Sequence, residues 1–256
     1  MAPGWRQWSE LHGYRLIVFD QPIDLSPRAR RRSPAWQKLL AMASPQLASV
    51  DQALWIDADV LIRPGAPDPW EGLDPGRVAM ARDVRSPLAD QPAWFKHTWC
   101  SILNNSLPAG QKSLQSYYNL WGFDANNRIL RNSGVVAFSP RNHADLFRDI
   151  YGRWEDGGDG ALYEMIPLNL ELSQRDLIVD LDERFNQLAG VQRAVWISQR
   201  QAVQELHGMG IAPLDEQSFL NLLLDRSYFL HFAGAHQLML DYLRKRHHGQ
   251  LSPSFG

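Results

Sequence analysis

The stretch ALWIDADVLIRP, residues 53–64, restricts the fold of this chain most, because it places two aspartates inside an apolar run. Apolar residues on both sides are typical of a buried β-strand, so the pattern predicts one strand over residues 52–62. In such a strand Asp57 and Asp59 share a face. Two carboxylates this close repel each other in a low-dielectric site unless one is protonated or a cation lies between them. A divalent cation resolves the conflict; the alternative is that the acids cap a loop or pair with Arg63.

The rest of the chain alternates short apolar runs with helical segments. Helices are predicted at residues 5–13, 33–44 (with Ser33 as N-cap) and 141–155. Residues 216–248 are predicted to form a helix, a short strand, a glycine-containing turn and a second helix, in that order. Strands are predicted at residues 14–20, 52–62, 78–82, 129–140 and at the start of 177–188. Loops are predicted at residues 21–34 and 63–69, and residues 84–120 are expected to be irregular or weakly helical. This alternation favours an α/β domain.

Composition excludes several classes of protein. The chain has 256 residues, 45% of them hydrophobic, and a net charge of −2, so nothing points to nucleic acid as a partner. The arginine run at residues 28–32 is expected to be a solvated loop. Cys100 is the single cysteine, which excludes an internal disulfide and a zinc–cysteine cluster. Because no apolar run reaches about 18 residues and the start lacks the pattern of a signal peptide, we expect a cytoplasmic protein without a transmembrane segment.

Three segments, in order, resemble one family of enzymes. Residues 33–64, SPAWQKLLAMASPQLASVDQALWIDADVLIRP, resemble the part of GT-A fold glycosyltransferases in which a lysine-bearing helix leads into a strand with the D-x-D motif. LRNSGVVAFSP resembles their asparagine-serine-glycine strand, and YFLHFAGA resembles their histidine-x-x-glycine motif. The pattern is similar to that of the retaining family of glycogenin, galactinol synthase and bacterial lipooligosaccharide galactosyltransferases. It implies one catalytic domain over residues 1–256, with a Rossmann-like mixed sheet flanked by helices.

The resemblance implies a role for each matching residue. The metal ligands for Mn²⁺ or Mg²⁺ would be Asp57, Asp59 and His231. The substrate-binding residues would be Lys38, Asp57, Asn132, Ser133, Gly134, Asn186, Gly234 and Gln237. Asn132 would lie beside the sugar or the acceptor, and Glu164 and Asp124 are further candidates for catalytic groups on the acceptor side, offered by the sequence rather than by a family motif. In this set Lys38 would contact the diphosphate or the donor sugar, and Gly234 would let the backbone approach the phosphates.

The implied reaction transfers a sugar from a nucleoside diphosphate donor, with a UDP-sugar favoured, to an acceptor hydroxyl. The acceptor would be a glycan, lipid, peptide or small molecule, and retention of configuration follows from the family. Metal-assisted stabilisation of the leaving diphosphate would drive the reaction. Two alternatives are a non-catalytic GT-A-like protein that binds a glycan or a partner, and a sugar nucleotidyltransferase. The second normally carries a glycine-rich basic loop after its first strand, which this sequence lacks.

The sequence departs from the family pattern at three places. The family's aspartate-glutamine pair after the asparagine-serine-glycine strand is missing, and Tyr163 and Glu164 occupy roughly that region. Gln237 stands where the family has a diphosphate-binding lysine, so His236, Arg244 or the arginine run would have to supply positive charge. The family's first strand, which helps to hold the nucleotide base, should precede the helix near Trp5, but no residues are present for it. Either the natural start lies upstream, which we favour, or another segment supplies the base pocket, or the enzyme is incomplete. Six aromatic residues are candidates for an acceptor cleft or for the core: Trp94, Phe95, Trp99, Tyr117, Tyr118 and Trp121.

Overall fold

The computed structural model describes residues 4–83, 130–156, 163–207 and 214–249. Its strands are β1 (Ala53–Ile56), β2 (Val60–Ile62), β3 (Val78–Arg82), β4 (Arg131–Phe138), β5 (Ile178–Leu181), β6 (Gln187–Leu188) and β7 (Phe229–His231). Its α-helices are α1 (Gly4–Leu11), α2 (Pro27–Arg31), α3 (Gln37–Met42), α6 (Pro140–Arg153), α7 (Met165–Gln174), α8 (Ala189–His207), α9 (Glu216–Arg226) and α10 (His236–Gly249). Short 3₁₀ helices are η1 (Pro34–Trp36), η2 (Pro45–Leu47) and η4 (Glu183–Asn186).

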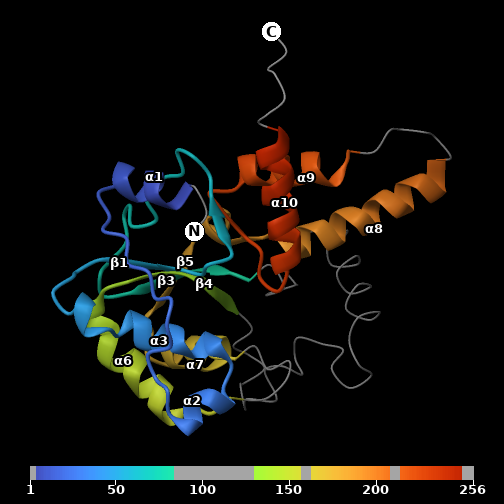
Figure 1. Cartoon of the computed structure of the whole chain (residues 1–256). Helices are drawn as coiled ribbons and strands as arrows, with labels where there is room; N and C mark the ends of the chain where they lie inside the picture. Colours follow the sequence, from blue (N-terminus) through green and yellow to red (C-terminus); the bar gives the residue numbers. More distant parts are fainter. Residues whose placement is uncertain (1–3, 84–129, 157–162, 208–213, 250–256) are drawn as a thin grey trace.

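The strands form two mixed sheets flanked by helices, so the predicted α/β class is confirmed (Figure 1). The first sheet has the order β1-β4-β3-β5, in which β4 is antiparallel to both neighbours and β3 is parallel to β5. The second sheet has the order β2-β7-β6, with β2 antiparallel and β6 parallel to β7. Helices α2, α3, α6 and α7 lie on one side of the first sheet, below it in Figure 1, and α1 lies on the other.

The prediction of one continuous strand over residues 52–62 is wrong. The chain leaves the first sheet after β1, turns at residues 57–59 and enters the second sheet as β2. The turn is closed by a hydrogen bond from the Val60 N–H to the Asp57 carbonyl, with an N···O distance of 3.1 Å. The change of sheet is required because β1 pairs with β4 while β2 pairs with β7. Asp57 and Asp59 therefore lie at the junction of the two sheets.

The core follows from the two-residue period of the central strands. Val78 and Met80 of β3 face α3, α6 and α7, whereas Ala79 and Ala81 face the second sheet and α1. The residues of β4 alternate in the same way. In the second sheet, Leu61 of β2 points away from the first sheet into a third cluster with α9 and α10. Sheet strands buried on both faces hold the junction between the two sheets rigidly.

Other predictions differ in outcome. The N-terminal helix, the Ser33 cap, and the strands and helices predicted after residue 77 are confirmed within the described ranges. The predicted strand at residues 14–20 is wrong: no described strand pairs with it, and Val18 keeps 56% of its surface exposed, so its apolar run has no partner to stabilise it. Residues 84–120, predicted to be irregular or weakly helical, lie outside the described ranges. No helix within the described ranges is long and apolar enough to cross a membrane.

The arginine-rich segment is also not simply a solvated loop. Ser26 caps the short helix α2, with Pro27 in its first turn. The Arg32 side chain is buried: it donates to the Tyr151 carbonyl at 2.8 Å and lies over the rings of Trp36 and Tyr151. Arg28 pairs with Glu155 at 2.7 Å. These two arginines therefore fasten α2 to the end of α6.

Candidate functional site

Three potential metal ligands meet at the junction of the two sheets. Asp57 follows β1, Asp59 precedes β2 and His231 ends β7. Each offers one ligand atom, and these atoms lie within 4.8 Å of one another. His231 Nε2 is 3.2 Å from Asp59 Oδ1 and 4.0 Å from Asp57 Oδ2. The three side chains therefore surround a common point.

Backbone pairing places these ligands. The Asp57 N–H donates to the Gly134 carbonyl at 2.8 Å, which extends the β1–β4 ladder by one residue. The Phe232 N–H donates to the Asp59 carbonyl at 2.9 Å, and Val60 lies opposite His231 in the β2–β7 pair. Because each ligand continues a strand, the sheets set its position before any cation binds.

The donor set fits a divalent cation. Two carboxylates and an imidazole form a mixed oxygen and nitrogen set, which suits Mn²⁺, and Mg²⁺ less well because of the imidazole. The three residues predicted as ligands therefore form a group that could hold a divalent cation.

Lys38 lies directly behind Asp57. Its Nζ is 3.0 Å from Asp57 Oδ2, 3.0 Å from Glu164 Oε1 and 3.2 Å from the Ser133 carbonyl. Burial disfavours the ammonium, but the two carboxylates outweigh this effect and hold the pKa of Lys38 above its usual range. Lys38 is thus charged and bridges two acids: Asp57, one of the three potential metal ligands, and Glu164, which lies in the core.

Ser133 and Glu164 form the buried wall behind Lys38. The Ser133 hydroxyl donates to Glu164 Oε1 at 2.8 Å, and Glu164 is 2% exposed. Burial raises the pKa of the Glu164 carboxyl, while Lys38 acts in the opposite direction. These two residues support Lys38 and Asp57 from the interior.

Asn132, Gly134 and Asn186 surround the imidazole of His231. Asn186 Oδ1 is 2.8 Å from His231 Nδ1, and Asn186 Nδ2 donates to Asn132 Oδ1 at 3.0 Å. A Cβ atom on Gly134 would lie 2.1 Å from Cε1 of His231, so only glycine leaves room for the ring. The structure therefore brings the asparagine-serine-glycine strand against His231, one of the three potential metal ligands.

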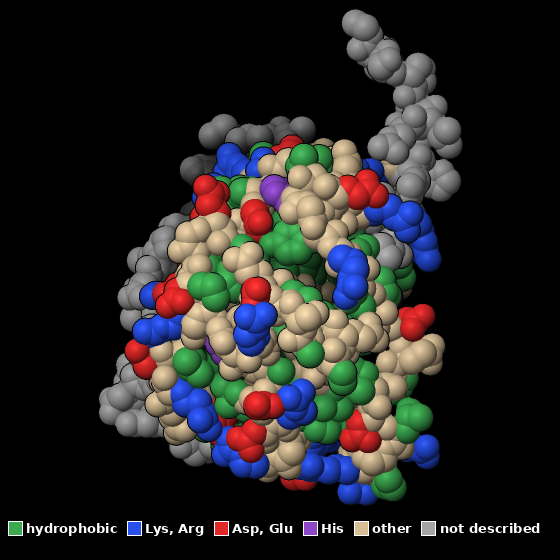
Figure 2. Space-filling model, turned by 90° about the vertical axis from the view of Figure 1, so that its left-hand side faces the viewer, with side chains coloured by type: hydrophobic (Ala, Val, Ile, Leu, Met, Phe, Trp, Pro, Cys, Tyr) green, Lys and Arg blue, Asp and Glu red, His purple; other side chains and the backbone are tan. Residues whose placement is uncertain are grey.

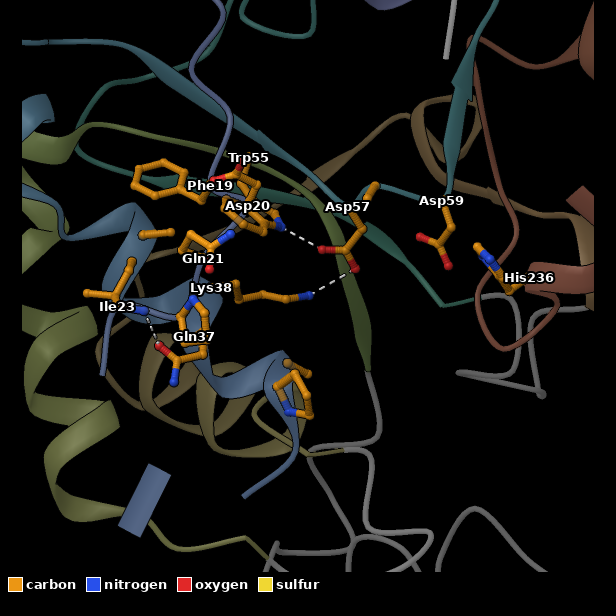
Figure 3. A pocket seen from close by; sticks show the side chains of 15 residues that line it. Phe19, Asp20, Gln21, Ile23, Gln37, Lys38, Trp55, Asp57, Asp59 and His236 are labelled. Carbon is orange, nitrogen blue, oxygen red and sulfur yellow. Dashed lines mark hydrogen bonds and ion pairs between the residues drawn. The ribbon is translucent and has the colours of Figure 1, made fainter. Parts of the chain in front are cut away.

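A pocket of about 540 Å³ opens beside the triad (Figure 3). Asp57, Asp59 and His236 line one end of it. Apolar side chains, including Phe19 and Trp55, line the other end, and the centroids of their rings are 6.5 Å apart. This volume is typical of small-molecule sites. The pocket thus joins an acidic end to an aromatic end.

The irregular segment that starts at the end of the predicted strand 14–20 forms a wall of this pocket. Residues 19–23 line it, together with Gln37. Gln37 Oε1 accepts hydrogen bonds from the N–H groups of Ile23 and Asp24, both at 3.0 Å, and the Tyr151 hydroxyl donates to Asp24 Oδ2 at 2.7 Å. Side chains rather than strand pairing hold this wall in place.

Sequence reasoning missed the role of Trp55. Its indole Nε1 donates to Asp57 Oδ1 at 2.6 Å, while its ring faces the pocket (Figure 3). The sequence did indicate this contact, because Trp55 and Asp57 are two residues apart and residues two apart along a strand share a face. Phe19, Asp20 and Gln37 carried no comparable signal, since only the tertiary fold brings them to Asp57.

Other candidates lie elsewhere. Gln237 donates along α10 to Asp241 at 2.9 Å, and Arg244 pairs with the same carboxylate at 3.2 Å; both contacts are exposed. Gly234 has φ +67 and open space around its Cβ position, which explains the glycine by its backbone conformation. Asp124 and the six aromatic candidates for an acceptor cleft lie outside the described residues.

Acidic and basic side chains are interspersed over the face shown in Figure 2. They alternate there with hydrophobic patches, without a broad area of one sign. This mixed surface agrees with the net charge of −2.

Comparison with known proteins finds one weak structural likeness. No protein-family model matches the sequence, and no curated protein matches it. Among solved structures, the chain is similar to the crystal structure of the galactosyltransferase LgtC in complex with donor and acceptor sugar analogues, at 14% identity and a TM-score of 0.39. The match covers 88% of this chain and 63% of that one. This chain therefore spans less than two thirds of the length of its structural neighbour.

Proposed function

We propose that the chain is a metal-dependent glycosyltransferase of the GT-A type, with residues 1–256 as one catalytic domain. Its donor is a nucleoside diphosphate sugar, a UDP-sugar by preference, and its acceptor is a hydroxyl group of a glycan, lipid, peptide or small molecule. The observation that carries this proposal is the pocket that joins the Asp57, Asp59 and His231 triad to an aromatic wall. A nucleoside diphosphate has the matching shape, with charge at one end and a flat base at the other.

The triad would hold Mn²⁺ or Mg²⁺. The cation, when bound, supplies positive charge to the diphosphate that leaves as the glycosidic bond breaks. With Glu164 ionised, the three carboxylates and the Lys38 ammonium leave two negative charges uncompensated, which one divalent cation balances. Lys38 orients the Asp57 carboxylate through their ion pair at 3.0 Å, so the triad stays ready to ligate.

The aromatic end would hold the nucleoside. Phe19 and Trp55 offer ring faces for a base, and base–aromatic stacking contributes about 1–3 kcal/mol per base. Asp20 and Gln21 line the same end and offer polar groups to ribose hydroxyls. In this proposal residues 19–23 supply the base pocket in place of the family's first strand, which is one of the alternatives that the sequence left open.

Asn132, Ser133 and Glu164 would act from behind the ligands. Among the described residues they contact Lys38, His231 or their partners rather than line the pocket. Retention of configuration follows from the family resemblance. In that mechanism the acceptor attacks from the side of the leaving group and a diphosphate oxygen takes its proton, so no protein nucleophile is needed.

The test is an assay with a panel of UDP- and GDP-sugars, with and without Mn²⁺. We expect Mn²⁺-dependent release of nucleoside diphosphate, and we expect Asp59→Asn to abolish both release and Mn²⁺ binding measured by calorimetry. Asp51→Asn is the matched control, since Asp51 forms an exposed ion pair with Arg141 at 3.1 Å.

Three outcomes contradict the proposal. The first is that no donor binds or is cleaved while Asp59→Asn leaves Mn²⁺ binding unchanged. The second is pyrophosphate release from a nucleoside triphosphate and a sugar phosphate, which identifies a nucleotidyltransferase. The third is metal-independent glycan binding without turnover, which identifies a non-catalytic binding protein.

A further inference from the structure

We propose that Asn132 and Asn186 are positioning residues that fix the tautomer of His231 and turn its free Nε2 lone pair toward the two carboxylates. This chain of hydrogen bonds, Gly134 to Asn132 to Asn186 to His231, is named the polarity relay. The inference rests on the proposed metal site. It assigns roles to Asn132 and Asn186, two residues that are not themselves metal ligands. It also reassigns both asparagines from substrate contact to orientation of a ligand.

The relay starts at a group that can only donate. The backbone N–H of Gly134 lies 2.9 Å from Asn132 Oδ1. A backbone N–H has no acceptor capacity, so the atom that it meets must be the oxygen of the Asn132 amide. On its other side, Asn132 Nδ2 lies 3.5 Å from a carboxylate oxygen of Asp83, which when ionised can only accept. Both neighbours select the same orientation of this amide.

The second link follows from the first. The Asn186 amide presents one atom to two acceptors, Asn132 Oδ1 at 3.0 Å and the Asn132 carbonyl at 3.1 Å. That atom must be the NH₂ group, which has two protons to donate. The other atom of the amide, facing His231, is therefore the oxygen.

The third link sets the ring. Asn186 Oδ1 is 2.8 Å from His231 Nδ1, so Nδ1 carries the proton. In a neutral imidazole the other nitrogen then has a bare lone pair. This nitrogen, Nε2, faces Asp59 Oδ1 at 3.2 Å. Two acceptors at this distance repel each other, and a cation between them turns the repulsion into ligation.

Burial gives the relay its strength. Asn132, Asn186 and His231 are 6%, 2% and 3% exposed, so water cannot replace a reversed hydrogen bond. The ring also packs closely against the backbone of β4, because a Cβ added to Gly134 would lie 2.4 Å from Nδ1. The three side chains come from β4, η4 and β7, so the relay connects the two sheets through their polar groups.

The test uses the full chain with ¹⁵N-labelled histidine, at a pH at which the ring is neutral. Ring nitrogen shifts measured by NMR report the tautomer directly, without metal or substrate, and calorimetry reports the affinity for Mn²⁺. The wild type should show the Nδ1–H tautomer. In Asn186→Leu we expect this preference to be lost and Mn²⁺ affinity to fall about 10- to 100-fold, the range typical of lost partners of a metal ligand.

Two further variants separate orientation from folding. Asn186→Asp keeps an oxygen on His231 Nδ1 but loses the donor to Asn132, so it should retain the Nδ1–H tautomer while it lowers stability. Asn169→Leu removes another buried amide, one that donates to the Arg131 carbonyl at 2.8 Å. The Asn169 amide bonds to the backbone of Arg131 and Met165 rather than to His231, so this variant should lower stability while the tautomer of His231 stays unchanged.

The inference is overturned by an Nε2–H tautomer in the wild type or in Asn186→Asp. It is also overturned if Asn186→Leu keeps both the Nδ1–H tautomer and the affinity for Mn²⁺. Failure of the proposed function looks different: the tautomer and Mn²⁺ results would be as expected, but no sugar donor would be bound or cleaved.

Discussion

The two ends of the pocket are built in different ways. At the acidic end, Asp57, Asp59 and His231 continue strands of two sheets, and hydrogen bonds of the backbone set their positions. At the aromatic end, residues 19–23 have irregular backbone and are held by the side chains of Gln37 and Tyr151. A site that must present ligand atoms to a cation gains from sheet rigidity, whereas a wall that packs on a flat ring tolerates a loop.

The two ends also differ in charge. The acidic end combines three carboxylates with one buried ammonium, so its stability depends on charge compensation. The aromatic end depends mainly on apolar contact between rings and aliphatic side chains. Substitutions at the acidic end should therefore change folding and metal binding together, and substitutions of the rings at the aromatic end should change nucleotide binding while metal binding stays unchanged.

The largest expected effect is that of Lys38→Met. Removing the ammonium leaves Glu164 and Asp57 without their shared partner, and loss of one member of a buried ion pair lowers the free energy of unfolding by about 3–5 kcal/mol. Urea unfolding measures this loss. The double variant Lys38→Met/Glu164→Gln should recover part of it, because it removes the buried charge that lost its partner.

The stability of Lys38→Met should also depend on pH. Burial already raises the pKa of Glu164, and loss of Lys38 raises it further. A carboxyl with a raised folded-state pKa binds its proton more tightly when folded, so its penalty is smallest at low pH and grows as pH rises through that pKa. The deficit relative to wild type should therefore shrink on acidification. An equal deficit at all pH values would show that Glu164 does not carry the effect.

Gly134→Ala should have the next largest effect. Its methyl group would lie 2.1 Å from Cε1 of His231, so ring or strand must shift; overpacking of this kind lowers the free energy of unfolding by about 1–3 kcal/mol. Mn²⁺ affinity should fall with it. Gly152→Ala in α6 is the matched control, since no atom lies within 4 Å of its Cβ position, and it should be neutral or stabilising by up to about 1 kcal/mol. Equal behaviour of the two variants would contradict the role of Gly134.

Phe19→Ala tests the aromatic end. We expect the affinity for a nucleoside diphosphate to fall about 10-fold, since stacking on one ring contributes about 1–3 kcal/mol. Affinity for Mn²⁺ alone should not change, because Phe19 lies at the opposite end of the pocket from Asp59 (Figure 3). The neighbouring Val18→Ala is the control, since Val18 is exposed and is not among the lining residues. Unchanged nucleotide affinity in Phe19→Ala would place the base elsewhere.

The smallest expected effect is that of Tyr151→Phe. It removes the hydrogen bond to Asp24 that fastens the aromatic wall to α6, and it should lower stability by about 1 kcal/mol. Burial and the Asp24 carboxylate raise the pKa of Tyr151 from 10.0 to about 12, so the folded chain holds this proton more tightly. The stability advantage of the wild type should be full below pH 10 and disappear as pH rises through about 12. An advantage that stays constant over that interval would contradict this assignment.

Local sequence determined several features of this protein. The two-residue spacing of Asp57 and Asp59, bounded by apolar runs, indicated a pair of acids that needs a cation. Serine and proline at residues 33 and 34 determined where the next helical segment begins, because the side chain caps and the ring presets the first turn. The strands β3 and β4 followed from their apolar content alone. These features depend on neighbours in the chain, so the sequence carries them directly.

Only the tertiary structure decided the rest. The run at residues 53–62 divides between two sheets because β1 pairs with β4 and β2 pairs with β7. Both partner strands lie far away in the chain. The apolar run at residues 14–20 has the composition of a strand but pairs with no described strand, and its last two residues, Phe19 and Asp20, line the pocket instead. The relay from Asn132 through Asn186 to His231 joins residues separated by 54 and 45 positions. Contacts between distant residues depend on how the whole chain packs, and no local pattern records them.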